Sequence, residues 1–296
     1  MSPGEASTMG DPQAEAETAA KRPSEPPVVF ARAIFLTTAA LAIWAWFFAH
    51  RLLFPSVLAA VLLLYFPAMS LVTPTDDIEL APDKTRFYII TAVVLLGLGG
   101  LGALSLAELR PLPPPYAGIL GGIAWSSLLV QTSVLLGGCL LLMGLFHLLG
   151  RTLGWEERPL VRQLMPRTPG EGSTYALLSG AAGIGEEIAY RAFLPVYLMP
   201  WTESYMVAAL IPCVAFGCLH MYQGGHGVFR TGLIGLLLAA GVSATGTIWA
   251  AVAAHTLLNL LVGLVLKDIL LGTADSSSGK GQAMEFNEPQ ADQDAT

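Results

Sequence analysis

Eight apolar runs recur along the chain, and most of them are long enough to cross a bilayer as a helix. Only 12% of the 296 residues are charged and 54% are hydrophobic, whereas a soluble domain carries about 25% charged residues. The sequence therefore predicts an all-α, polytopic transmembrane helical bundle of about eight spans. The spans are expected at about residues 30–50, 53–73, 86–106, 118–149, 173–199, 203–222, 228–243 and 246–270.

Helix-ending residues separate the runs, for example the charged loop at 73–84 and the RPLPPP segment at 110–115. Gly137 and Gly138 could bend or divide the fourth run, and the seventh run is short and rich in glycine. The predicted organisation has five parts, in chain order: a disordered cytoplasmic tail at 1–27, a four-span scaffold at 28–150, an amphipathic connector at 151–172, a four-span core at 173–271 and a disordered tail at 272–296.

Basic residues indicate the orientation of the chain. Eight spans place both termini on one side of the membrane, and twelve of the fifteen Lys and Arg residues fall on that side. Arg51 and Arg110 fall on the other side, and Arg191 lies within a span. The bias predicts a multi-pass protein, expected in the plasma membrane, with both termini in the cytoplasm. The connector then lies along the cytoplasmic face, either as an interfacial helix or as a solvated loop.

Ionisable side chains inside the spans are unexpected, because each charge at mid-membrane costs about 2.5–3.5 kcal/mol on insertion scales. They concentrate in the last four runs, whereas the first four are almost free of them. The fifth run carries Glu186, Glu187 and Arg191, the sixth carries His220, and the eighth carries His255 and Asn259. This asymmetry indicates a scaffold half followed by a half that carries the chemistry.

The spacing of these residues predicts how they face one another. Glu187 and Arg191 are four apart in the favourable order for an ion pair on one helix face, so Glu186 is left to face something else. The same spacing of four recurs in the pairs Phe216 and His220, and His255 and Asn259. Each pair alone could be ordinary packing, a structural ion pair or interhelical hydrogen bonding. Their joint presence on neighbouring spans favours a common polar site. His226, in a Gly-rich loop, is assigned no role.

These residues resemble the three motifs of the CPBP intramembrane protease family. The motifs are Glu186-Glu187-x-x-x-Arg191, Phe216-x-x-x-His220 and His255-x-x-x-Asn259, and the resemblance covers about residues 170–262. The family includes the type II CAAX prenyl endopeptidases and relatives that process bacteriocins or confer immunity to them. One departure is visible, because the family commonly has an aromatic residue and a glycine around the arginine. This chain has Tyr190 and Ala192 there.

The resemblance implies a membrane endopeptidase with its catalytic core in the last four spans. It implies that Glu186 and His220 activate a water molecule and that His255 and Asn259 stabilise the oxyanion. Glu187, Arg191 and Phe216 would support them. The expected partners are a peptide or protein substrate at the membrane and the lipid bilayer, with no nucleic acid.

Two questions stay open at the level of sequence. Glutamate chemistry without a metal is favoured, but Glu186, His220 and His255 would also make a legitimate set of zinc ligands. A different class of function is also possible. A non-catalytic scaffold or immunity-type protein would keep the polar residues as structural glue, and a proton-coupled transporter would use Glu186 and the histidines as a relay. A transporter of this kind predicts repeated halves, which this sequence does not show.

Overall fold

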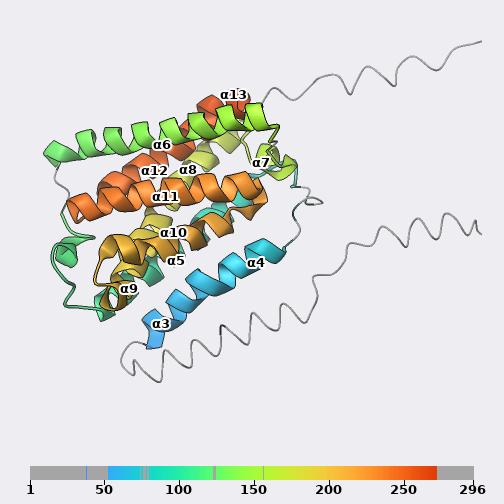
Figure 1. Cartoon of the computed structure of the whole chain (residues 1–296). Coiled ribbons are helices and arrows are strands. Elements are labelled where there is room, and N and C mark those ends of the chain that lie inside the picture. Colours follow the sequence, from blue (N-terminus) through green and yellow to red (C-terminus); the bar gives the residue numbers. More distant parts are fainter. Residues whose placement is uncertain are drawn as a thin grey trace, which may run out of the picture.

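The computed structural model describes residues 38, 53–73, 75, 78, 80–122, 125–155 and 157–271. The regular structure of these residues is helical, and the helices pack side by side as a bundle (Figure 1). Within this part of the chain, five helical segments are long and apolar enough to cross a membrane: Leu53–Val72, Thr85–Glu108, Trp125–Leu153, Gly225–Thr245 and Trp249–Leu270. The predicted all-α polytopic bundle is therefore confirmed.

The first half of the described chain supplies three long helical segments. The first consists of α3 (Leu53–Ala60), a π-helical stretch η1 (Val61–Tyr65) and α4 (Phe66–Val72). Helix α5 (Thr85–Glu108) follows, then a short 3-10 turn η2 (Tyr116–Gly118) and α6 (Trp125–Leu153). The span expected at 30–50 lies outside the described residues, apart from Thr38.

The second half begins with the short helix α7 (Pro159–Gln163). The fifth run is one continuous helix made of α8 (Pro169–Glu187), the π-helical η3 (Ile188–Phe193) and α9 (Leu194–Thr202). Helix α10 (Tyr205–Leu219) and the turn η4 (Met221–Gln223) lead to α11 (Gly225–Thr245). The last segment combines α12 (Trp249–Leu260), the π-helical η5 (Leu261–Leu266) and α13 (Lys267–Leu271).

Three boundaries differ from the expectations. Helix α6 starts at Trp125 rather than near 118, because residues 116–121 form tight turns, and it then runs through Gly137 and Gly138 without interruption. Helix α11 has 21 residues and is not short. It fills the interval between Gly224 and Gly246, whose positive φ angles of 88° and 71° mark its two ends.

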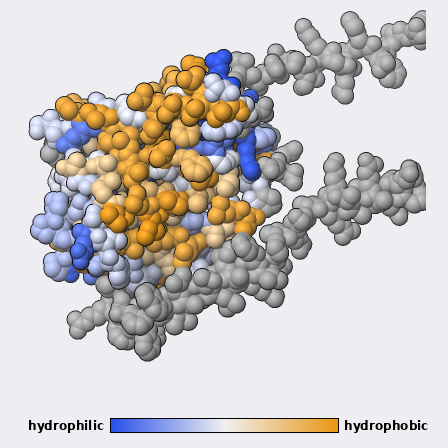
Figure 2. Space-filling model, viewed as in Figure 1, coloured by the Kyte–Doolittle hydropathy of each residue, from blue (hydrophilic) through white to orange (hydrophobic). Residues whose placement is uncertain are grey.

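The outer surface of the bundle is apolar. Figure 2 shows a broad hydrophobic area across the middle of the face formed by α6, α10 and α11, with hydrophilic residues toward the two ends of the helices. Side chains such as Leu129 and Leu141 on α6 are 76% and 75% exposed. Exposed apolar area on this scale is unfavourable in water and is the expected surface of a helical bundle in lipid.

Glycines bring two helices close to α8 just before the glutamate motif. A Cβ at Gly185 would overlap the carbonyl oxygen of Leu95 on α5. A Cβ at Gly183 would overlap the hydroxyl of Thr256 on α12. Because both positions lack a side chain, α5 and α12 pack against the backbone of α8 on either side. This close packing fixes the part of α8 that carries Glu186 and Glu187.

Charged side chains join the start of α5 to the start of α8. The buried Lys84 ammonium lies 3.3 Å from Glu171 Oε2, and the same carboxylate accepts the backbone N–H of Arg167 at 2.6 Å. Burial alone would raise the pKa of Glu171. The N–H groups of Arg167 and Lys84 and the Lys84 ammonium more than offset it, so its pKa lies below the usual value. The two helices are thereby held together at this end of the bundle.

The segment around α7 lies across the same end of the bundle. The Tyr88 hydroxyl donates to the carbonyl of Leu164 at 2.9 Å, and the ammonium groups of Lys84 and Lys267 donate to the carbonyls of Met165 and Pro166. On the other side of α7, Arg230 of α11 forms an ion pair with Glu157. The segment is therefore attached to α5, α11 and α13.

Candidate active site

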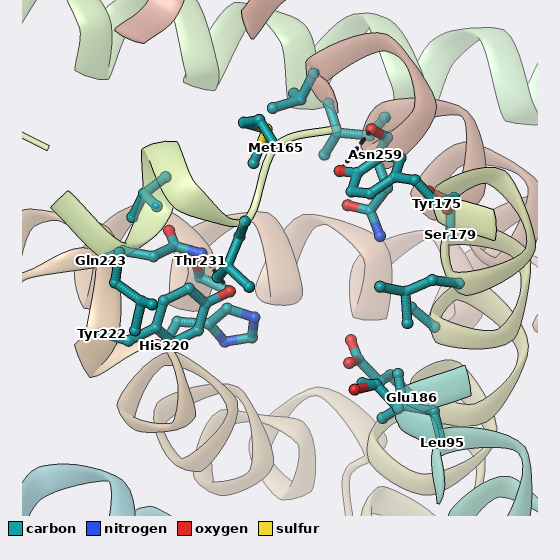
Figure 3. Close-up of a pocket in the computed structure, with 18 of the residues that line it drawn as sticks. Leu95, Met165, Tyr175, Ser179, Glu186, His220, Tyr222, Gln223, Thr231 and Asn259 are labelled. Atoms are coloured by element: carbon teal, nitrogen blue, oxygen red, sulfur yellow. Dashed lines mark hydrogen bonds between the residues drawn. The ribbon is translucent and has the colours of Figure 1, made fainter. Parts of the chain in front are cut away.

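A cavity of about 660 Å³ lies inside the bundle. Glu186, His220, His255 and Asn259 all line it, so the structure brings together the four residues that the motifs single out. In Figure 3, Glu186 on α8 and His220 at the end of α10 face each other across the cavity. The amide of Asn259 points into the same space from α12. The volume falls within the range of about 300–1,000 Å³ that is typical of ligand pockets.

The sequence suggested a cavity formed by the last four spans, but earlier helices also form part of its wall. Helix α4 contributes Met69 and Ser70, and α5 contributes Phe87, Tyr88 and Leu95. Leucine and methionine side chains of the α7 segment also line the cavity. Helix α5 packs directly against the helix that carries the two glutamates. The first half of the chain therefore adds to the cavity wall, whereas Glu186, His220, His255 and Asn259 all come from the second half.

The predicted ion pair between Glu187 and Arg191 is present and fully buried. Arg191 Nη1 lies 3.0 Å from Glu187 Oε1, and both side chains are 0% exposed. The same oxygen also accepts a hydrogen bond from His255 Nδ1 at 2.8 Å. Because a carboxylate can only accept, the Nδ1 atom of His255 carries the proton. Glu187 therefore holds two of the other motif residues in place.

The contact with Glu187 decides which face of His255 meets the cavity. With Nδ1 turned toward Glu187, Nε2 lies 3.7 Å from Glu186 Oε2. This distance is too long for a direct hydrogen bond. It leaves Glu186, whose side chain is 16% exposed, as the glutamate of the pair that faces the cavity. The two adjacent glutamates thus occupy different environments, as their spacing predicted.

His220 is placed by the end of its helix. It follows the last residue of α10, and its Nδ1 lies 2.8 Å from the carbonyl oxygen of Phe216. A carbonyl oxygen only accepts, so Nδ1 is again a protonated nitrogen, and in the neutral ring Nε2 then carries a lone pair. The ring of Phe216 packs against His220, with centroids 4.8 Å apart, and against the guanidinium of Arg191. Phe216 therefore contacts two of the motif residues.

Two of the motifs lie at π-helical turns, and Arg191 lies within the first of them. The stretch Ile188–Phe193 begins after Glu187, and the stretch Leu261–Leu266 begins shortly after Asn259. Turns of this kind are rare and occur frequently at functional sites. Helical periodicity in a sequence does not reveal them, because the apolar pattern continues through both stretches.

Several cavity residues were not singled out from the sequence. Tyr175 lines the cavity, and its hydroxyl donates to the carbonyl oxygen of Asn259 at 3.3 Å. Arg230 also lines it and contacts Gln223 at 2.8 Å as well as Glu157. His226, which was assigned no role, lies 3.5 Å from the same Glu157 and stacks on Trp155. The basic residues of the α7 region were the one sequence signal that pointed to the contacts with Glu157.

The residues considered as zinc ligands do not form a compact ligand set. Among the described residues, no three side chains of His, Cys, Asp or Glu lie close enough together to hold a metal ion. Glu186 and His220 face each other from opposite walls of the cavity, so these side chains do not surround a common point. This arrangement does not fit a three-ligand zinc site.

Comparison with known proteins finds a similarity in the part of the chain that carries this site. Residues 171–261 match the family model described as type II CAAX prenyl endopeptidase Rce1-like. The matched segment contains all seven motif residues, from Glu186 to Asn259. No curated protein and no solved structure matches the chain. From the start of α8 to the beginning of η5, the chain is therefore similar to the type II CAAX prenyl endopeptidases of the Rce1-like family.

Proposed function

We propose that the protein is an integral-membrane endopeptidase that hydrolyses peptide bonds of a membrane-associated peptide or protein. The observation that carries this proposal is the convergence of Glu186, His220, His255 and Asn259, all within the segment that matches the Rce1-like family model, on one cavity. A structural ion pair or interhelical hydrogen bonding does not need a second glutamate, two histidines and an amide around a shared space. Peptide hydrolysis needs such groups to activate water and to stabilise the oxyanion.

Glu186 and His220 are suited to activate the water molecule. The carboxylate of Glu186 faces the cavity and forms no direct hydrogen bond with another described side chain. His220 faces it from the opposite wall. Because His220 uses Nδ1 to donate to Phe216, its Nε2 can accept a hydrogen bond from water. A water molecule between the two groups would be oriented by His220 and deprotonated by Glu186.

His255 and Asn259 are suited to stabilise the oxyanion. The Asn259 amide offers N–H donors directly. His255 already donates from Nδ1 to Glu187, so it can donate from Nε2 only when both ring nitrogens are protonated. The doubly protonated ring would lie between two carboxylates, 2.8 Å from Glu187 Oε1 and 3.7 Å from Glu186 Oε2.

The reaction follows from these roles. The water oxygen forms a bond to the carbonyl carbon of the substrate while its proton passes to Glu186, and the negative charge that develops on the carbonyl oxygen is stabilised by Asn259 and His255. Collapse of this intermediate breaks the bond between carbon and nitrogen. Glu186 returns its proton to the leaving amine, and the products are a carboxylic acid and an amine.

The site also suggests the class of substrate. The cavity combines these polar groups with apolar side chains from α4, α5 and the α7 segment. An apolar-anchored peptide matches this combination, because its anchor can remain in lipid while a polar bond reaches Glu186. The basic residues near α7 further support a cytoplasmic position for the α7 end of the bundle. Substrate would then approach from the cytoplasmic side of the membrane, which we expect to be the plasma membrane.

The proposal is tested by Glu186→Gln, which removes the base and preserves the shape of the side chain. The purified protein in liposomes is incubated with reporter peptides that carry a prenyl group, an acyl group or an apolar helix as anchor, and products are identified by mass spectrometry. Wild type should cleave at least one class, and Glu186→Gln should lower the rate by about 10²–10⁴-fold. Glu108→Gln, an exposed substitution at the far end of α5, is the control and should retain full activity.

The same assay addresses the metal. If the glutamate acts without zinc, cleavage should survive EDTA and phenanthroline, and elemental analysis should find well below one zinc ion per chain. Zinc at one ion per chain, together with activity that is lost on chelation and restored by added metal, would contradict this mechanism. Failure of wild type to cleave any of the three peptide classes would contradict the proposed function itself.

A further inference from the structure

The guanidinium of Arg191 is held by an unusual set of contacts. It is fully buried, and within the described part of the chain its one ion pair runs from Nη1 to Glu187 Oε1 at 3.0 Å. Among the described residues, its Nε and Nη2 atoms have no hydrogen-bond partner. Its Cζ atom lies 4.1 Å from the centre of the Phe216 ring. The group is therefore positioned by packing on its other faces, because hydrogen bonds hold it at only one point.

One of these packing surfaces is a glycine outside all three motifs. A Cβ built on Gly235, in the middle of α11, would lie 2.7 Å from Arg191 Nη2 and 3.5 Å from the Phe216 ring. The first distance is too short for any real side chain. The backbone of Gly235 does not have the positive φ that would require glycine. Glycine inside a helix also costs stability relative to alanine. The glycine at this position is therefore explained by the space that the Arg191 guanidinium occupies.

We propose that Gly235 is a positioning residue for the catalytic histidine His255. It leaves a slot between α11 and Phe216 into which the guanidinium of Arg191 fits. Arg191 fixes Glu187 Oε1, and that same oxygen receives His255 Nδ1 at 2.8 Å. The line of contact runs from α11 through α8 to α12, and its last member is a side chain that lines the cavity.

This inference rests on the proposed function only for its catalytic readout. Gly235→Ala should push the guanidinium away from α11, shift Glu187 and turn His255. A displacement of about 1 Å at a catalytic group can cost about 10²-fold in rate. We therefore expect kcat to fall by about that factor while KM stays nearly unchanged, because the cavity walls that bind substrate are left intact.

Gly232→Ala is the matched control, one turn earlier on the same helix. Its Cβ would lie 3.4 Å from the carbonyl oxygen of Cys213, which is close to an ordinary contact. Both substitutions bring the same gain in helix propensity. Gly232→Ala should therefore keep kcat near the wild-type value, and equal activity of the two alanine variants would overturn the proposal.

A second readout does not depend on activity. The chain has five histidines, and in protein labelled with ¹⁵N-histidine the His255 signals can be assigned by their loss in His255→Gln. The Nδ1–H signal should shift in Gly235→Ala and stay in place in Gly232→Ala. An unchanged signal in Gly235→Ala overturns the proposal even if wild type cleaves no peptide, and the absence of cleavage would by itself count only against the proposed function.

A third variant covers the case in which Gly235→Ala does not fold. Lysine at position 191 lacks the Nη2 atom that meets the new methyl group, so the double variant Gly235→Ala/Arg191→Lys should recover folding and the His255 signal relative to Gly235→Ala. In a double-mutant cycle, the effect of Gly235→Ala should be smaller with lysine at 191 than with arginine. Equal effects in the two backgrounds would show that Gly235 does not act through Arg191.

Discussion

At the scale of single residues, the site depends on one buried oxygen atom. Glu187 Oε1 accepts from both Arg191 and His255, whereas Glu186 next to it faces the cavity. The pair between Glu187 and Arg191 could be predicted from a spacing of four residues. The contact between Glu187 and His255 could not, because these residues are 68 positions apart and meet only through the packing of α8 against α12.

The first prediction separates the two glutamates by stability. Glu187→Gln should lower the free energy of unfolding by about 3–5 kcal/mol, because it leaves the buried guanidinium of Arg191 without a counter-charge. Glu186→Gln should cost much less, since Glu186 forms no such pair with the arginine. Thermal melting of both variants in the same detergent measures the difference. Similar melting temperatures for the two variants would contradict the division of roles.

At the scale of helices, the lengths of the apolar runs predicted most of the bundle. What they did not predict is which helices surround the site. Helix α5 carries no catalytic residue, and its part in the cavity depends on how closely it packs against α8 at Gly99 and Gly185. The cluster of glycines at residues 97–102 was the available signal. This cluster does not predict the contact with α8, because glycine alone does not identify the partner helix. The π-helical turns after Glu187 and near Asn259 leave no mark in an apolar pattern.

The second prediction tests this packing. Gly185→Ala should destabilise the protein by about 1–3 kcal/mol or more, because the new methyl group meets the backbone of α5, which cannot rotate away as a side chain can. It should also reduce cleavage, since Leu95 and Glu186 border the cavity near this crossing. Melting curves and peptide assays give the two results.

The matched control for Gly185→Ala lies on the same helix. A Cβ at Gly180 of α8 would meet nothing within 4 Å. Gly180→Ala should therefore be neutral, or stabilising by up to about 1 kcal/mol from helix propensity. If both alanine variants behave alike, close packing of α5 on α8 does not determine the geometry of the site.

At the scale of the whole molecule, basic side chains gather at one end of the bundle. The contacts of Lys84, Lys267 and Arg230 tie the α5, α13 and α11 helices to the α7 segment, and Arg158 and Arg162 lie in or beside α7 itself. Arg110, just after α5, lies at the opposite end. This separation of charge along the helices is what the positive-inside rule requires of a cytoplasmic and an external face.

The last prediction concerns this orientation. Arg162 on α7 and Glu108 at the end of α5 are both exposed, and the 24 residues of α5 separate the two ends by about 36 Å. Cysteine is placed at one position or the other in a chain whose three native cysteines, Cys139, Cys213 and Cys218, are replaced by alanine. A membrane-impermeant maleimide should label Glu108→Cys in intact cells. It should label Arg162→Cys only after permeabilisation, because we propose that this face is cytoplasmic. The opposite labelling pattern would invert the topology and move the approach of the substrate to the outer side. Labelling of both positions in intact cells would mean that the two ends do not lie on opposite sides of the membrane.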